Sequence, residues 1–160
     1  MTLSHDTMTD DQRRALIVDY FNTFDAGGDV LQYFHPDARV WFPKWGLAVG
    51  VEQIEKMFAD LGGAMRRIDH HVTELTYIFT GGGLCAVEGV THGEHRDGSW
   101  RAGEPQWGAG RWCDVFEIND WKIQRCYIYL DPDYANQDTQ RYTWLAGATV
   151  GATATATATD

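Results

Sequence analysis

The spacing of hydrophobic residues changes once along this chain of 160 residues, and that change limits the folds that the chain can adopt. Within residues 10–26, Leu16, Tyr20 and Phe24 recur at every fourth position, which is the spacing of one helix face. From about residue 67 the spacing becomes two, which is typical of β-strands with one buried face. Helices followed by a run of strands predict an α+β domain, with the helices packed on one face of an antiparallel sheet.

Start and stop signals divide the first half of the chain into three helices and one short strand. After the helix over 10–26, Asp29 is a candidate N-cap for a short second helix that Pro36 stops. The segment "ARVWFP" is typical of a short strand, and a third helix runs from about residue 51 to 61, where Gly62-Gly63 ends it. Four longer strands joined by hairpin turns are predicted at about residues 67–79, 84–95, 107–118 and 122–131.

The length of the chain fits one domain, which we place at residues 10–134. Residues 1–9 are expected to form a disordered N-terminus. Residues 135–160 form a C-terminal extension that ends in the low-complexity stretch "GATATATATD", which predicts a mobile tail.

Charge and composition exclude several classes of partner. The net charge is −10 and no basic stripe interrupts it, so nucleic acid and anionic membranes are not expected partners. No apolar run is long enough for a membrane helix, and "MTLSHDTMTDD" does not resemble a signal peptide. A cytoplasmic location is the expectation, with the three cysteines as reduced, buried thiols.

One carboxylate falls where a strand should face the protein interior. In the strand over 107–118, Trp112, Asp114 and Phe116 share the more apolar face. A carboxyl group between two large rings loses solvation, so its pKa should rise unless a partner compensates. Asp114 is therefore a candidate proton or hydrogen-bond donor near neutral pH. The alternative is an aspartate that bonds a backbone amide or an arginine at the sheet edge.

Two adjacent histidines, His70 and His71, open the strand predicted at 67–79. Adjacent strand residues point to opposite faces, so one ring should face inward and the other outward. Both faces carry apolar residues, and periodicity does not decide between the two histidines. The inward ring is either a catalytic group or a hydrogen-bonded core residue. Tyr20 on the first helix and Asp25 near its end are likewise either catalytic groups or residues with a purely structural role.

Signals for a metal or a cofactor are weak. In "HGEH", His92 and His95 would point to opposite faces of a strand, so no metal site is expected. The glycines at 81–83 join two strands rather than a strand and a helix, so they predict a turn instead of a phosphate-binding loop. We expect a chain that works without cofactor or metal.

Several stretches resemble a known superfamily. The order of elements resembles the nuclear transport factor two-like fold, a cone-shaped curved sheet with an internal pocket. "YFNTFDAGGDVLQYFHPDARVWFP" and "HHVTEL" are similar to segments of its SnoaL-like branch, which includes polyketide cyclases and scytalone dehydratase-type enzymes. "GRWCDVFEINDWKIQRCYIYLD" resembles the closing hairpin of the superfamily. The resemblance covers about residues 10–134.

The resemblance implies roles for four residues. Tyr20, Asp25 and His70 match positions at which the dehydratases use a tyrosine, an aspartate and a strand histidine in proton transfer, and this match favours His70 over His71. Asp114 matches the aspartate that ketosteroid isomerases keep protonated against an oxyanion. The general base of those isomerases precedes a proline, where this chain has Phe42, which argues against steroid isomerase chemistry.

Two hypotheses follow. In the first, the chain is a cofactor-independent dehydratase, isomerase or cyclase for a small hydrophobic carbonyl compound. His70, Asp25, Tyr20 and Asp114 act on this compound inside a pocket lined by Trp41, Phe42, Trp45, Trp112 and Phe116. In the second, the same pocket only binds a hydrophobic ligand, or the domain is a dimerisation module. Tyr127 and Tyr129 on the opposite sheet face predict a homodimer interface under either hypothesis.

Overall fold

The computed structural model describes residues 8–96, 98–101 and 110–130. Its α-helices are α1 (Asp10–Asp25) and α2 (Val51–Ala64), and its 3-10 turns are η1 (Leu31–Tyr33) and η2 (Val72–Glu74). The strands are β1 (Phe34–Phe42), β2 (Gly46–Val49), β3 (Met65–Asp69), β4 (Thr76–Phe79), β5 (Leu84–Val90), β6 (His92–His95), β7 (Gly98–Arg101), β8 (Arg111–Asn119) and β9 (Lys122–Leu130).

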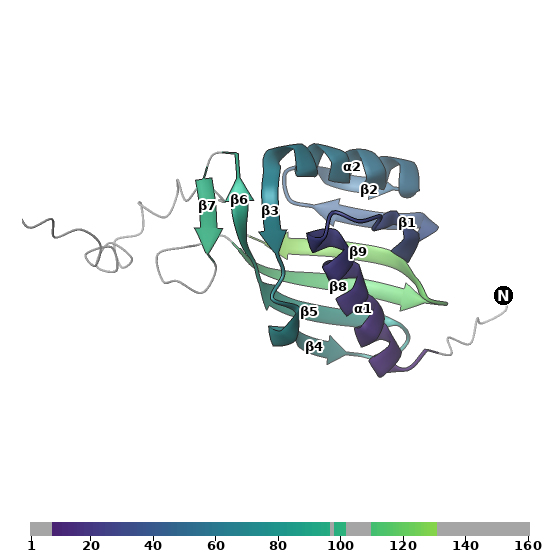
Figure 1. The fold of residues 1–160 in the computed structure, drawn as a ribbon. Coiled ribbons are helices and arrows are strands. Elements are labelled where there is room, and N and C mark those ends of the chain that lie inside the picture. The colour runs from purple at the N-terminus through teal and green to yellow at the C-terminus, as the bar shows by residue number, and fades with distance from the viewer. Residues whose placement is uncertain (1–7, 97, 102–109, 131–160) are drawn as a thin grey trace, which may run out of the picture.

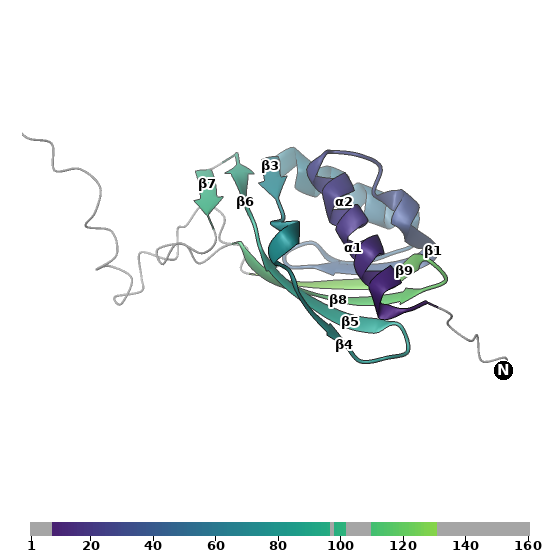
Figure 2. The ribbon, with the colours of Figure 1, turned by 60° about the horizontal axis from the view of Figure 1, so that its bottom comes forward.

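The strands form two sheets. The large sheet has six strands in the order β2-β1-β9-β8-β5-β4, and the small one has three in the order β3-β6-β7. Both α-helices lie on one face of the large sheet, which curves around α1, and the small sheet extends from one end (Figures 1 and 2). Strands β1 and β9 are parallel, so the large sheet is mixed rather than wholly antiparallel as predicted. The mixed α+β architecture with a curved sheet is as expected.

Helix α1 agrees with its prediction to within one residue. Thr9 caps it in a capping box with Gln12, and Gly27 follows its end with a φ of 68°. Its buried stripe, which includes Ile17 and Tyr20, packs into the core between the helices and the large sheet. Met8 is also part of that core, so the predicted disordered N-terminus is too long by Met8 and Thr9. Residues 1–7 and 131–160 lie outside the described residues.

The second predicted helix is reduced to a single 3-10 turn. Only the 3-10 turn η1 forms after Asp29, and Pro36 lies inside β1 instead of stopping a helix. Proline is tolerated there because the pairing of β1 with β9 shifts register between Phe34 and Arg39, where no ladder hydrogen bond is lost. The described residues thus hold two α-helices rather than three. Helix α2 also continues through Gly62-Gly63 to Ala64.

Two of the four predicted long strands are interrupted. The segment 67–79 divides into β3, the turn η2 and β4, and these strands belong to different sheets. The segment 84–95 divides likewise into β5 and β6, with Thr91 between them. Periodicity continues across both breaks, which is why the sequence pattern did not reveal them. The hairpin of β8 and β9 agrees closely with its prediction.

None of the helices among the described residues combines the length and the apolar character that crossing a membrane requires.

Candidate functional site

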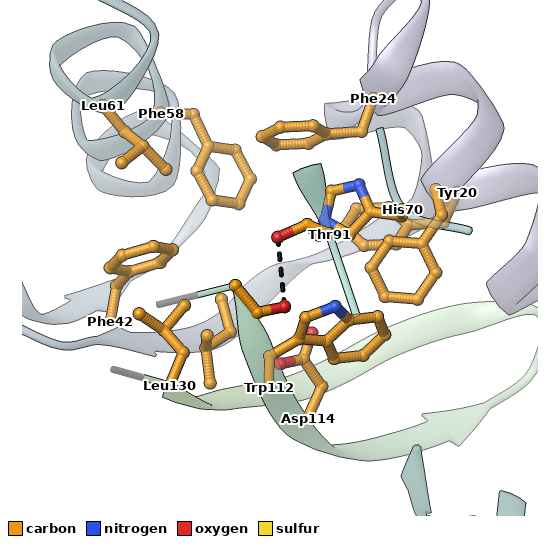
Figure 3. Close-up of a pocket in the computed structure, with 13 residues that line it drawn as sticks. Tyr20, Phe24, Phe42, Phe58, Leu61, His70, Thr91, Trp112, Asp114 and Leu130 are labelled. Carbon is orange, nitrogen blue, oxygen red and sulfur yellow. Dashed lines mark hydrogen bonds between the residues drawn. The ribbon is translucent and has the colours of Figure 1, made fainter. Parts of the chain in front are cut away.

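A narrow cavity lies between the two α-helices and the concave face of the large sheet (Figure 3). It encloses about 490 Å³ between its wall atoms, open mouth included. Most of its wall is aromatic or aliphatic. The lining residues are Tyr20, Phe21, Phe24, Phe42, Phe58, Leu61, His70, Thr91, Gly110, Trp112, Asp114, Ile128 and Leu130.

Local structure directs these side chains into the cavity. Tyr20 and Phe21 are buried on α1 and Phe24 is partly buried, so the helix covers one side of the cavity. On β8, Trp112 and Asp114 are both inward because alternate strand residues share a face. The link between β3 and η2 supplies His70.

His70 is held by the carboxylate of Asp25 at the end of α1. Oδ1 of Asp25 lies 2.5 Å from Nδ1 of His70, and Oδ2 accepts the backbone N–H of His70 at 2.8 Å. Because the carboxylate can only accept, Nδ1 carries the proton of that bond. Nε2 is therefore the ring nitrogen that remains available to a molecule in the cavity. This pair answers the question left open by the sequence: His70 lines the cavity, and His71 does not.

Three aromatic rings surround the His70 imidazole. Phe21 lies 4.6 Å from it between ring centroids, while Phe24 and Trp112 each make edge contacts at 5.6 Å. The side chains of His70 and Asp25 are 12% and 21% exposed. The surrounding rings exclude most of the water from the pair and fix the plane of the imidazole, as a proton-transfer group requires.

Asp114 is a polar side chain on an otherwise apolar part of the cavity wall. Burial raises the pKa of its carboxyl group well above the ordinary value, and the nearby Cys126 thiol, 3.9 Å from Oδ2, lowers it only in part. No described residue hydrogen-bonds to Oδ1, which is buried. Burial therefore favours the protonated form of Asp114, which can donate a hydrogen bond.

Two further donors face the same cavity. Tyr20 is buried, and that burial raises the pKa of its hydroxyl well above the ordinary value, so the hydroxyl keeps its proton. The indole Nε1–H of Trp112 is buried with no hydrogen-bond partner in the described part of the chain. A bound oxygen atom would satisfy such donors, since buried N–H groups normally have partners.

The position of Trp112 depends on Gly89 of the neighbouring strand β5. A Cβ atom at Gly89 would lie 2.5 Å from Cζ2 of Trp112 and 2.6 Å from Cδ2 of Leu75, so an alanine there must displace the indole. We expect Gly89→Ala to lower the free energy of unfolding by about 1–3 kcal/mol, measured by urea denaturation. Gly62→Ala is the matched control, because a Cβ there meets nothing within 4 Å and alanine favours helix α2. Equal stability of the two variants would contradict this packing.

Three of the five aromatic residues predicted to line the pocket do not do so. Trp41 follows Val40 and precedes Phe42, which both face the core, so its ring lies on the outer face against Tyr129. Trp45 donates its Nε1–H to Asp60 at 2.7 Å. Phe116 is fully buried, under Tyr20 and Phe21 of α1. Phe42 and Trp112 do line the cavity.

Sequence reasoning missed several wall residues. Phe24, Phe58 and Leu61 lie on the two α-helices, and only the packing of these helices over the sheet brings their side chains to the cavity. Thr91 was placed inside one long strand. It is buried at the break between β5 and β6, and its hydroxyl donates to the carbonyl of Gly110 at 3.3 Å (Figure 3).

The rings predicted to form a homodimer interface lie on the outer face of the large sheet. Trp41 and Tyr129 are 5.4 Å apart between ring centroids, and the guanidinium of Arg125 lies 5.2 Å from the ring centre of Tyr127. Asp131, which would continue this face, lies outside the described residues. Dimerisation through these rings stays a prediction.

Comparison with solved structures supports the fold. An NTF2-like protein from Anabaena variabilis ATCC 29413 superposes with a TM-score of 0.62 at 18% identity, over 82% of this chain and 98% of that one. A protein from Xanthomonas campestris pv. campestris assigned as a polyketide cyclase gives 0.61 at 16% identity, over 87% and 98%. TerC, co-crystallised with polyporic acid, gives 0.59 at 16% identity, over 75% and 92%.

Sequence comparison gives the family. A search of curated proteins finds no significant match. The family model of the SnoaL-like domain, however, matches residues 15–126, which run from within α1 to the middle of β9 and hold most of the residues that line the cavity. The structural neighbours show that the chain has the nuclear transport factor two-like fold, and the family match shows that it belongs to the SnoaL-like domain family.

Proposed function

We propose that this chain is a cofactor-independent enzyme of the cyclase, isomerase or dehydratase type. It would move a proton at the carbon next to a carbonyl group of a small hydrophobic, polyketide-like substrate. One observation carries the proposal: a histidine fixed by an aspartate shares a narrow apolar cavity with a buried carboxyl group whose pKa is raised. Titratable groups with opposed environments in one cavity are typical of acid–base sites.

Each polar group has a role in this reaction. Nε2 of His70 takes the proton from the carbon, and the Asp25 carboxylate stabilises the imidazolium that forms. The protonated Asp114 and the hydroxyl of Tyr20 donate hydrogen bonds to the enolate oxygen as its charge develops. His70 then returns the proton to another carbon, which isomerises the substrate, or to a leaving hydroxide, which dehydrates it. Attack of the enolate carbon on a second carbonyl carbon would instead close a ring, and the alkoxide formed from that carbonyl would take the proton from His70.

The proposed substrate class follows from the walls and from the neighbours. Facing phenylalanine rings and a narrow free space favour a flat, largely apolar molecule that carries few oxygen atoms. The neighbours assigned as a polyketide cyclase or crystallised with polyporic acid support such a class. Because one fold carries many reactions, the reaction itself is tested by experiment.

Deuterium exchange tests the proposal without knowledge of the natural substrate. We expect the protein to accelerate exchange of the C2 protons of α-tetralone in D2O, followed by proton NMR, because this ketone is flat and apolar and exchanges through an enolate. We also expect 2-naphthol, a phenol that resembles the enolate, to inhibit this exchange by competition. An exchange rate equal to that of buffer, with 2-naphthol bound, would contradict catalysis. That result would favour the second hypothesis, in which the cavity only binds a hydrophobic ligand.

A further inference from the structure

A second group of polar side chains lies in the small sheet, next to the cavity wall. Asp69 ends β3, His71 lies in the link that follows, and His92 begins β6. Asp69 and His92 are direct partners in the antiparallel pairing of β3 with β6. The break after β3 turns the chain back, so His71 lies beside the same pair. Residues far apart in the sequence therefore meet at one point.

The contacts within this group are close. Nε2 of His71 lies 2.6 Å from Nδ1 of His92, and the two rings meet edge to face with centroids 4.8 Å apart. Nε2 of His92 lies 3.8 Å from Oδ2 of Asp69. One ligand atom from each of the three residues can be chosen so that all lie within 4.8 Å of one another. Such spacing is compatible with one shared cation.

We propose that Asp69, His71 and His92 bind a divalent transition-metal ion, and Zn²⁺ is the ion with which we argue and test the site. Two imidazoles and one carboxylate are a ligand set that such ions prefer, whereas Mg²⁺ and Ca²⁺ prefer oxygen ligands. Zinc–nitrogen bonds are about 2.0–2.1 Å long, so two nitrogens on one tetrahedral ion lie roughly 3.3 Å apart. The ion therefore replaces the direct contact between the two histidines, and it increases the distance between these nitrogens by less than about 1 Å.

Exposure and charge fit an open site. The side chains of His92 and Asp69 are 40% and 44% exposed, which leaves an entry path and room for water to complete the coordination shell. The net charge of −10 favours a cation over an anion at the surface. The sequence pattern hid the site because His71 and Asp69 come from one segment and His92 from another.

The site adjoins the cavity through the backbone. His71 directly follows His70, and His92 directly follows Thr91, and both His70 and Thr91 line the cavity. A bound ion would join the link that carries His70 to β6, and so hold two parts of the cavity wall together. The metal proposal does not rest on the proposed reaction, because its ligands lie outside the cavity.

Calorimetric titration of the untagged, EDTA-treated full chain with zinc chloride tests the proposal. We expect one equivalent to bind, and we expect the melting temperature to rise with zinc concentration, because ligands that bind the folded state stabilise it. His71→Asn, His92→Asn and Asp69→Asn should each weaken binding by more than about 10-fold, since even loss of a group behind a ligand costs roughly that. His35→Asn removes a histidine from β1 and should bind zinc as the wild type does.

The wild-type protein alone gives a second readout. X-ray absorption of its zinc complex should show two imidazole ligands and oxygen. Charge-transfer absorption of its cobalt complex should be absent, because no thiolate takes part. Circular dichroism checks that each variant folds, and the absorption experiments need no variant. Failure to bind zinc, binding that survives both histidine substitutions, or a sulfur ligand such as Cys113 would each overturn the proposal.

Discussion

Replacing His70 by asparagine is expected to lower the rate of α-tetralone exchange by about 10²–10⁴-fold, the usual contribution of a general acid–base group. Asparagine occupies similar space but takes up no proton at neutral pH. Its backbone N–H can still donate to Oδ2 of Asp25, so the link after β3 should keep its position. The initial rate of exchange, measured by NMR at fixed substrate concentration, checks this expectation.

Asp25→Asn separates the hydrogen bond that this side chain accepts from the backbone of His70 from the effect of its negative charge. The single carbonyl oxygen of an amide can still accept the backbone N–H of His70, but the amide lacks the second acceptor and the negative charge that stabilises the imidazolium. We expect a smaller loss than in His70→Asn, in the turnover rate rather than in the affinity for 2-naphthol. His35→Asn is the control, because His35 lies on β1 and does not line the cavity. Full activity of His70→Asn would show that the His70–Asp25 pair is structural.

Asp114→Asn should make the protein more stable than the wild type, by an amount that grows with pH. Below the pKa of an unfolded aspartate, about 3.9, the carboxyl group is protonated in both states and the two proteins should be similar. Above it the unfolded wild type releases the proton while the folded state retains it, because burial raises the folded pKa of Asp114. The wild type should therefore lose about 1.4 kcal/mol per pH unit relative to the variant until the pH passes the folded pKa.

Urea denaturation at pH 4, 5, 6 and 7 measures this difference. Asp37→Asn removes a carboxylate from an exposed position on β1 and controls for the change in net charge. A difference in stability that stays constant across this range would mean that Asp114 titrates as it does in the unfolded chain. It would then be ionised in the cavity at neutral pH, and it would not donate a hydrogen bond to an enolate.

The two largest effects test different parts of one site. Loss of activity in His70→Asn concerns the group that moves the proton, and the pH-dependent stability of Asp114→Asn concerns the group that meets the developing charge. The first needs a substrate and the second does not. The state of Asp114 can therefore be established even before a natural substrate is known.

Regular segments with one clear period were predictable from the sequence. Helix α1 and the β8–β9 hairpin agree with their predictions because each has a single buried face and local start and stop signals. The inward position of Asp114 followed from strand alternation alone, and its neighbours Trp112 and Phe116 also face inward. The family resemblance rested in part on these same segments.

The predictions were wrong for segments whose structure depends on strands that are distant in the sequence. Pro36 did not stop a helix, because its segment pairs with β9 across a register shift. Neither His70 nor His71 lies in a strand, because the chain leaves β3 at Asp69 to enter another sheet. Local pattern contains no information on either event, since the partner strands are more than 20 residues away.

The sequence by itself therefore determined the α+β class, the residues of the first helix face and the burial of Asp114. The tertiary structure alone decided which histidine meets Asp25, which rings line the cavity and that Asp69, His71 and His92 come together. The physical reason is that periodicity reports only whether one side of a segment is buried. Which side chains meet across a cavity depends on how helices and strands from distant parts of the chain pack together.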